Sequence, residues 1–169
     1  GITPFIVEKG FPGFSVSRKL DKFGHRGSPT AELRLDDCRV PRGNVIGKVD
    51  DGVGIMMRGL DCERVFMAGE PIGIAEEALA LAIAYARQRE QFGQPIGSFQ
   101  LIQAKLADMY TQLEAARALV YQTALQAERS PASKEAAAAI LFAGEMATRT
   151  ALDAMQIHGG YGYLNDLPL

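Results

Sequence analysis

Cysteine and histidine are scarce in this chain, with two residues of each among 169. Cys38 and Cys62 are too few for a disulfide framework, and their surroundings lack the spacing of metal ligands. Neither His25 nor His158 stands in a cluster of cysteines or carboxylates, so the sequence predicts no metal site. We expect His25 to be a loop residue.

Long apolar runs and a strong excess of one charge are also absent. No run of about 18 apolar residues occurs, so no membrane span is expected. The net charge of −2 argues against a nucleic-acid-binding surface. The hydrophobic content of 47% and a mean hydropathy of −0.01 are typical of a globular core. Because the chain starts at Gly1 without methionine, we expect an internal fragment of a longer protein.

Residues 1–50 are β-like. Alternating or β-branched runs predict strands over residues 2–8, 14–17 and 31–36, with Leu33 and Leu35 on one face of the last. Glycine and proline separate these runs. By themselves, so few strands would form a marginal sheet.

Residues 51–169 are helical in pattern. One helix is predicted from Val53 toward Arg89 with a break at Pro71, a second from near Ser98, and a third from Ser133 to Gly159. The second has a buried stripe with helical spacing: Phe99, Ile102, Leu106, Met109 and Leu113. On the third, Ile140, Ala147, Ala151 and Met155 are predicted to share one face. Long helices with short loops predict a bundle.

Glu63 is a candidate general base. Helical geometry places Leu60, Phe66 and Met67 beside it, so the carboxylate would lie in an apolar stripe. Burial would then raise its pKa and suit it to accept a proton near neutral pH. The alternative is a glutamate paired with a cation of another helix. Asp61 and Arg64 could likewise pair with each other, or contact a polar group of a substrate.

Arg89 precedes a tight turn and could hold a phosphate through paired hydrogen bonds. Gln100 opens the next helix, where free N–H groups favour an anion. Together these two residues could hold a pyrophosphate, although each could equally be a surface or capping residue. The segment Gln156–Gly162 has three glycines in four residues, more than a plain helix cap requires.

Two of these segments resemble signatures of the acyl-CoA dehydrogenase family. The first is Arg89-x-x-Phe92-Gly93-x-x-Ile96, followed by Gln100 and Ala107-Asp108-Met109. The second is Gln156-x-x-Gly159-Gly160-x-Gly162. Residues 59–73 are most similar to the isovaleryl-CoA branch of the family.

The resemblance implies an α+β, multi-domain fold. Residues 1–50 would be the C-terminal half of a middle β-domain of barrel or sandwich type, and residues 51–169 a truncated antiparallel helical bundle. It also implies an FAD enzyme, usually a homotetramer. In such an enzyme a carboxylate removes the α-proton of an acyl-CoA thioester, the β-hydride passes to the flavin, and an electron-transferring flavoprotein accepts the electrons. The fragment by itself is expected to be inactive.

The same resemblance assigns roles to individual residues. Glu63 would be the catalytic base, and the substrate would contact Asp61, Cys62 and Arg64. The cofactor, shared with a neighbouring subunit, would meet Arg89, Phe92, Gln100, Gln156, Ile157, His158, Gly159 and Gly160.

Several alternatives stay open at this point. The base could lie in a more C-terminal segment, as in family members acting on short straight or 2-methyl-branched chains. An acyl-CoA oxidase would share the fold, and a non-catalytic helical assembly module is the alternative from another class. The compartment would be the mitochondrial matrix in a eukaryote or the cytoplasm in a bacterium.

Overall fold

The computed structural model describes residues 1–166, which divide into two compact units, Gly1–Arg58 and the chain from Gly59 onward. Helix α1 (Gly52–Met67) runs through the division. The last three residues of the predicted helical domain lie outside the described residues. The predicted domain boundary between residues 50 and 51 stays a prediction.

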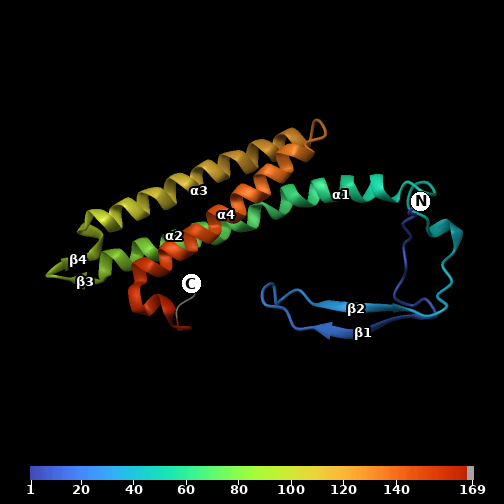
Figure 1. The fold of residues 1–169 in the computed structure, drawn as a ribbon, viewed down its shortest axis with the longest axis horizontal. Helices are drawn as coiled ribbons and strands as arrows, with labels where there is room; N and C mark the ends of the chain where they lie inside the picture. The colour runs from blue at the N-terminus through green and yellow to red at the C-terminus, as the bar shows by residue number, and fades with distance from the viewer. Residues whose placement is uncertain (167–169) are drawn as a thin grey trace. The chain divides into compact units, whose positions relative to one another are not determined.

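The first unit contains an antiparallel hairpin of β1 (Phe14–Leu20) and β2 (Thr30–Leu35) (Figure 1). Its register pairs Phe14 with Leu35 and Val16 with Leu33. The apolar side chains therefore share one face of the ribbon, as the alternating pattern predicts.

The structure does not show the expected part of a β-barrel or β-sandwich. Within residues 1–166 this sheet has only two strands, too few to close or to form two layers. The predicted strand over residues 2–8 is wrong as a regular strand, because only Phe5 forms an isolated bridge, with Val45. The segment facing it begins with the short 3-10 helix η1 (Arg42–Asn44), which interrupts a regular ladder.

The second unit is built on α2 (Gly69–Gln88), α3 (Gln100–Ala127) and α4 (Ser133–His158) (Figure 1). Pro71 is the third residue of α2, where its missing N–H is tolerated but a continuous helix from α1 is not. The predicted break is therefore confirmed, with Ala68 at the junction.

The predicted stripe on α3 is confirmed, since each of its five residues belongs to the core or packs against it. On α4, Ala147 of the predicted face is buried, and the other three residues of that face are partly buried. The buried residues of α4 also include Ala139, Ala143, Met146, Ala154 and Ile157. Alanines sit at most of these positions, and hydropathy alone ranks them below Ile140, which is only partly buried.

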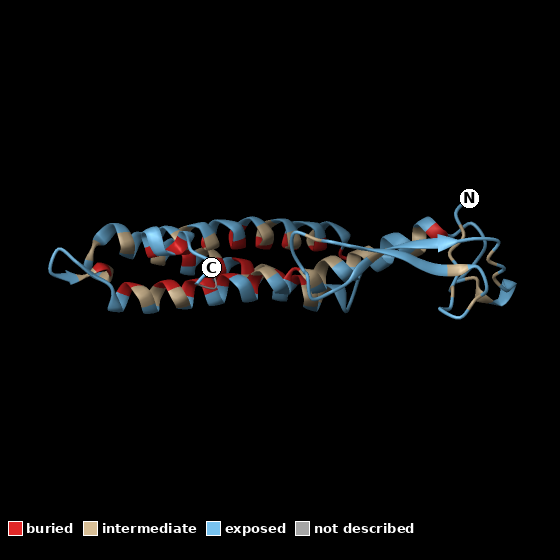
Figure 2. Cartoon of the chain, turned by 90° about the horizontal axis from the view of Figure 1, so that it is seen from below, coloured by how far each residue is buried: buried red, intermediate tan, exposed pale blue. Residues whose placement is uncertain are grey.

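Small side chains let α2 and α4 approach closely. Both helices present alanines to the core: Ala75, Ala78, Ala82, Ala86, Ala139, Ala143 and Ala154. Figure 2 shows the buried residues gathered on the inner sides of the bundle helices. Among the described residues, no helix combines the length and the apolar content needed to cross a membrane.

A two-residue hairpin connects α2 to α3. Strands β3 (Glu90–Gln91) and β4 (Gln94–Pro95) flank Phe92 and Gly93, which both have positive φ, 54° and 80°. Two positive φ values in a two-residue loop are typical of a type I′ turn. The 3-10 helix η2 (Ile96–Ser98) then leads into α3.

Candidate functional site

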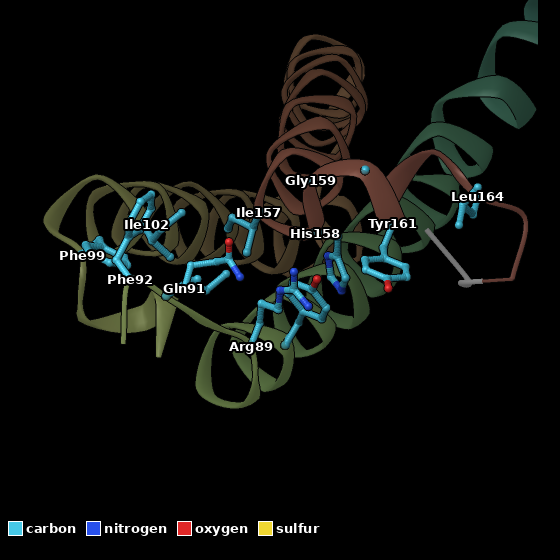
Figure 3. Close-up of a pocket in the computed structure, with 13 residues that line it drawn as sticks. Arg89, Gln91, Phe92, Phe99, Ile102, Ile157, His158, Gly159, Tyr161 and Leu164 are labelled. Atoms are coloured by element: carbon cyan, nitrogen blue, oxygen red, sulfur yellow. The ribbon is translucent and has the colours of Figure 1, made fainter. Parts of the chain in front are cut away.

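A cavity of about 600 Å³ lies where the C-terminal ends of α2 and α4 meet the N-terminal end of α3 (Figure 3). The hairpin and the 3-10 helix η3 (Gly159–Tyr163) complete its wall. It is lined by Tyr85, Arg89, Gln91, Phe92, Ile96, Phe99, Ile102, Ile157, His158, Gly159, Gly160, Tyr161 and Leu164. This volume is in the range of small-molecule and cofactor sites.

Phe92 is held in a strained and exposed position at this cavity. Its φ of 54° is unusual for a bulky residue, and its side chain is 94% exposed. Its ring meets that of Phe99 edge-on, with centroids 6.1 Å apart. Strain of this kind in an exposed aromatic residue favours a role in ligand binding over a role in the core.

Arg89 supplies the positive charge of the cavity. Its backbone joins α2 to the hairpin, because its N–H donates to the Tyr85 carbonyl at 2.8 Å and its own carbonyl accepts from Ile96 at 2.8 Å. The guanidinium carbon lies 5.9 Å from the centre of the Tyr161 ring, within the range of a cation–π contact. No aspartate or glutamate is among the lining residues, so within the described chain the guanidinium is available to an anion.

The three glycines after α4 differ in what requires a glycine at each position. Gly159 has a φ of +61° at the end of the helix, and a Cβ at Gly162 would collide with the Met155 carbonyl. Gly160 has neither constraint, since its φ is ordinary and a Cβ there would meet nothing within 4 Å. Gly160 therefore leaves backbone open to the cavity, which permits a ligand to approach closely.

His158 is buried at the last position of α4. Its Nδ1 lies 2.8 Å from the Ala154 carbonyl oxygen, and its ring stacks on Tyr85 with centroids 4.3 Å apart. The side chain therefore forms a rigid part of the cavity wall.

Most of the predicted cofactor residues meet at this cavity. Those that line it are Arg89, Phe92, Ile157, His158, Gly159 and Gly160. Gln100 and Gln156 do not line it, and both are exposed, in the first turn of α3 and the last turn of α4. Sequence reasoning missed Tyr85, which lies one helical turn before Arg89, and Tyr161, which lies inside the glycine-rich segment.

The predicted catalytic group lies apart from this cavity, on α1. Glu63 and Cys62 are exposed, and Phe66, which the pattern placed in an apolar stripe beside Glu63, is 84% exposed. The expected burial of Glu63 is therefore wrong for the described chain.

Asp61 and Arg64 pair with each other, as one of the two sequence alternatives holds. Arg64 Nη1 donates to Asp61 Oδ1 at 2.9 Å, and both side chains are partly buried. The Ser133 hydroxyl at the start of α4 donates to the other oxygen of Asp61. Within residues 1–166, no group of three or more histidines, cysteines or carboxylates could hold a metal ion.

Comparison with known proteins places this geometry in a family. Residues 50–169 match the family model described as acyl-CoA dehydrogenase, C-terminal domain. The chain belongs to the acyl-CoA dehydrogenase family. It is 53% identical to a mitochondrial isovaleryl-CoA dehydrogenase of Oryza sativa subsp. japonica, over 99% of this chain and 41% of that protein. It is 51% identical to a mitochondrial 2-methylacyl-CoA dehydrogenase of Solanum tuberosum, over 99% of this chain and 41% of that protein.

The fold agrees with this assignment. The structure of butyryl-CoA dehydrogenase from Megasphaera elsdenii superposes with a TM-score of 0.96 at 47% identity, covering 99% of this chain and 44% of that one. The chain thus spans less than half the length of the relatives to which it is similar.

Proposed function

We propose that this chain is part of an FAD-dependent dehydrogenase that oxidises a short branched acyl-CoA thioester between its α and β carbons, with isovaleryl-CoA as substrate and 3-methylcrotonyl-CoA as product. The observation that carries the proposal is the cavity at the end of the bundle. It combines the cation Arg89, which no carboxylate among the described lining residues faces, with an apolar wall and an open glycine backbone, the features that a dinucleotide requires.

The lining residues fit the adenosine diphosphate half of FAD. Arg89 would pair with the pyrophosphate, since a guanidinium matches phosphate oxygens with two donors. Phe92, Phe99 and Ile102 would pack against the apolar faces of the nucleoside. When bound, FAD supplies the acceptor for the β-hydride. Because this cavity sits on the outer end of a bundle, the cofactor would be shared with a neighbouring subunit of a homo-oligomer, a tetramer by family resemblance.

Glu63 would take the α-proton of the thioester onto a carboxylate oxygen. Arg64, the neighbour of Glu63 on α1, is already paired with Asp61 at 2.9 Å. Arg64 therefore does not neutralise Glu63. Substrate and further protein would have to cover Phe66 and Glu63, which would exclude water and strengthen the base. An electron-transferring flavoprotein is the proposed acceptor of the electrons.

A second candidate is a dehydrogenase for another short acyl-CoA. It is favoured by the similarity to proteins named for 2-methylacyl-CoA and butyryl-CoA. In that case the base would lie in a more C-terminal segment. A panel of isovaleryl-, 2-methylbutyryl- and butyryl-CoA would rank the substrates by kcat/KM.

The deciding experiment mixes the full-length protein that carries these residues with isovaleryl-CoA without oxygen and follows flavin bleaching, beside Glu63→Gln. We expect rapid bleaching in the parent and a rate lower by roughly 10²–10⁴-fold in the variant, the usual contribution of a general base. Equal bleaching in both would move the base elsewhere, and no bleaching with any acyl-CoA would reject the dehydrogenase itself. Equal FAD content in the two proteins is the control.

A further inference from the structure

One nitrogen of the cavity wall lacks a partner. A carbonyl oxygen can only accept, so the Nδ1 of His158, 2.8 Å from the Ala154 carbonyl, must carry its proton. In the neutral ring this leaves Nε2 as a hydrogen-bond acceptor. Within residues 1–166 no side chain or backbone group is bonded to Nε2.

Nε2 is nevertheless reachable. His158 is only 6% exposed, yet no unpartnered side-chain nitrogen or oxygen is completely enclosed among the described residues. His158 lines the cavity, and Figure 3 shows its ring between Arg89 and Tyr161. A polar group more than nine-tenths buried and left without a partner is costly unless a ligand satisfies it.

The side chains around the ring leave Nε2 to a ligand. The other titratable side chains that line the cavity are Tyr85, Arg89 and Tyr161. None of these is a carboxylate, so among the described lining residues no anion competes for Nε2. The stack on Tyr85 and the bond to Ala154 also keep the ring from turning.

Resting on the proposed function, we infer that His158 is a specificity-determining residue of the cofactor site. Its Nε2 accepts a hydrogen bond from a neutral N–H or O–H donor on the adenosine half of FAD. The donor is either the exocyclic amino group of adenine or a ribose hydroxyl. Arg89 and His158 then recognise different parts of one ligand, the anionic pyrophosphate and the neutral nucleoside.

The test measures the dissociation constant of FAD from the apo form of the full-length protein by flavin fluorescence. Three variants separate the two ring nitrogens. His158→Gln places an amide near the position of Nε2, His158→Asn places one near Nδ1, and His158→Phe keeps only the stacking ring. We expect affinity within about threefold of the parent for Gln and roughly tenfold weaker for Asn and Phe, the value of one hydrogen bond.

Each alternative outcome is distinct. Parent-like affinity in His158→Phe, or rescue by Asn in place of Gln, would overturn the inference and leave the proposed function intact. A parent that retains no FAD would overturn the proposed function itself. An FAD analogue without the adenine amino group separates the donors: it abolishes the difference between parent and Phe variant if the amino group is the donor, and preserves it if a hydroxyl is.

A measurement on the unaltered protein guards against variants that fail to fold. Histidine labelled with ¹⁵N and observed by solid-state NMR should show a protonated Nδ1 and an unprotonated Nε2 for His158, whose signals are identified by their absence from the spectrum of His158→Gln. On addition of FAD, the Nε2 signal should move in the direction of a hydrogen-bonded nitrogen. An unchanged Nε2 signal in the FAD-bound protein would refute the hydrogen bond.

Discussion

Asp61 accepts a hydrogen bond from Arg64 one turn further along α1, at 2.9 Å, and a second one from Ser133 at the start of α4. One carboxylate therefore connects the helix that carries Glu63 to the helix that ends at the cavity. The side chains of Asp61 and Arg64 are 23% and 33% exposed, so solvent screens this pair less than a fully exposed one.

Replacing Asp61 by Asn should lower the free energy of unfolding by about 1 kcal/mol, because the amide keeps one acceptor but loses the charge. Urea unfolding followed by circular dichroism measures this change. The matched control is Glu76→Gln. Its partner Arg117 lies 3.6 Å away and the Glu76 side chain is 62% exposed, so its loss should cost less than about 0.5 kcal/mol. Equal effects of the two substitutions would show that Asp61 does not connect the helices.

Replacing Phe92 by Asn should stabilise the hairpin and weaken the ligand site. Asn-Gly is favoured in a type I′ turn, whereas the φ of 54° strains the backbone at Phe92. We expect the free energy of unfolding to rise by about 0.5–1 kcal/mol, while FAD retention on gel filtration of the full-length protein falls. A variant that is less stable than the parent would mean that Phe92 contributes packing that outweighs the strain.

Gly160 and Gly162 should respond differently to alanine. Gly162→Ala places a methyl group against the Met155 carbonyl and should cost about 1–3 kcal/mol of stability. Gly160→Ala has open space and an ordinary φ, so its urea midpoint should match that of the parent while its affinity for FAD falls. If Gly160→Ala binds FAD as tightly as the parent does, the open backbone is not part of the site.

Ala143 tests the close packing of α4 in the bundle. It is fully buried, so Ala143→Leu should overpack the bundle and cost about 1–3 kcal/mol or more. Ala138, five residues earlier on the same helix, is exposed, and Ala138→Leu should change the free energy of unfolding by less than about 0.5 kcal/mol. A neutral Ala143→Leu variant would mean that the helices can separate without loss.

Local patterns in the sequence determined the helices, their breaks and the shared face of Leu33 and Leu35. Proline at position 71, glycine at position 159 and the spacing of the α3 stripe act through backbone geometry within a few residues, so they can be recognised without a tertiary structure. The two family motifs likewise sufficed to indicate the cavity, because both lie at helix ends that a bundle brings together.

Tertiary structure alone decided which residues share an environment. It placed Tyr85 against His158, put His158 in the wall of the cavity, and buried alanines of α4 more deeply than Ile140. It also left Glu63 and Phe66 exposed, although their spacing on α1 predicted burial. The physical reason is that helical periodicity states which side chains lie together, whereas burial depends on what packs against them, and that partner is not encoded within the same few residues.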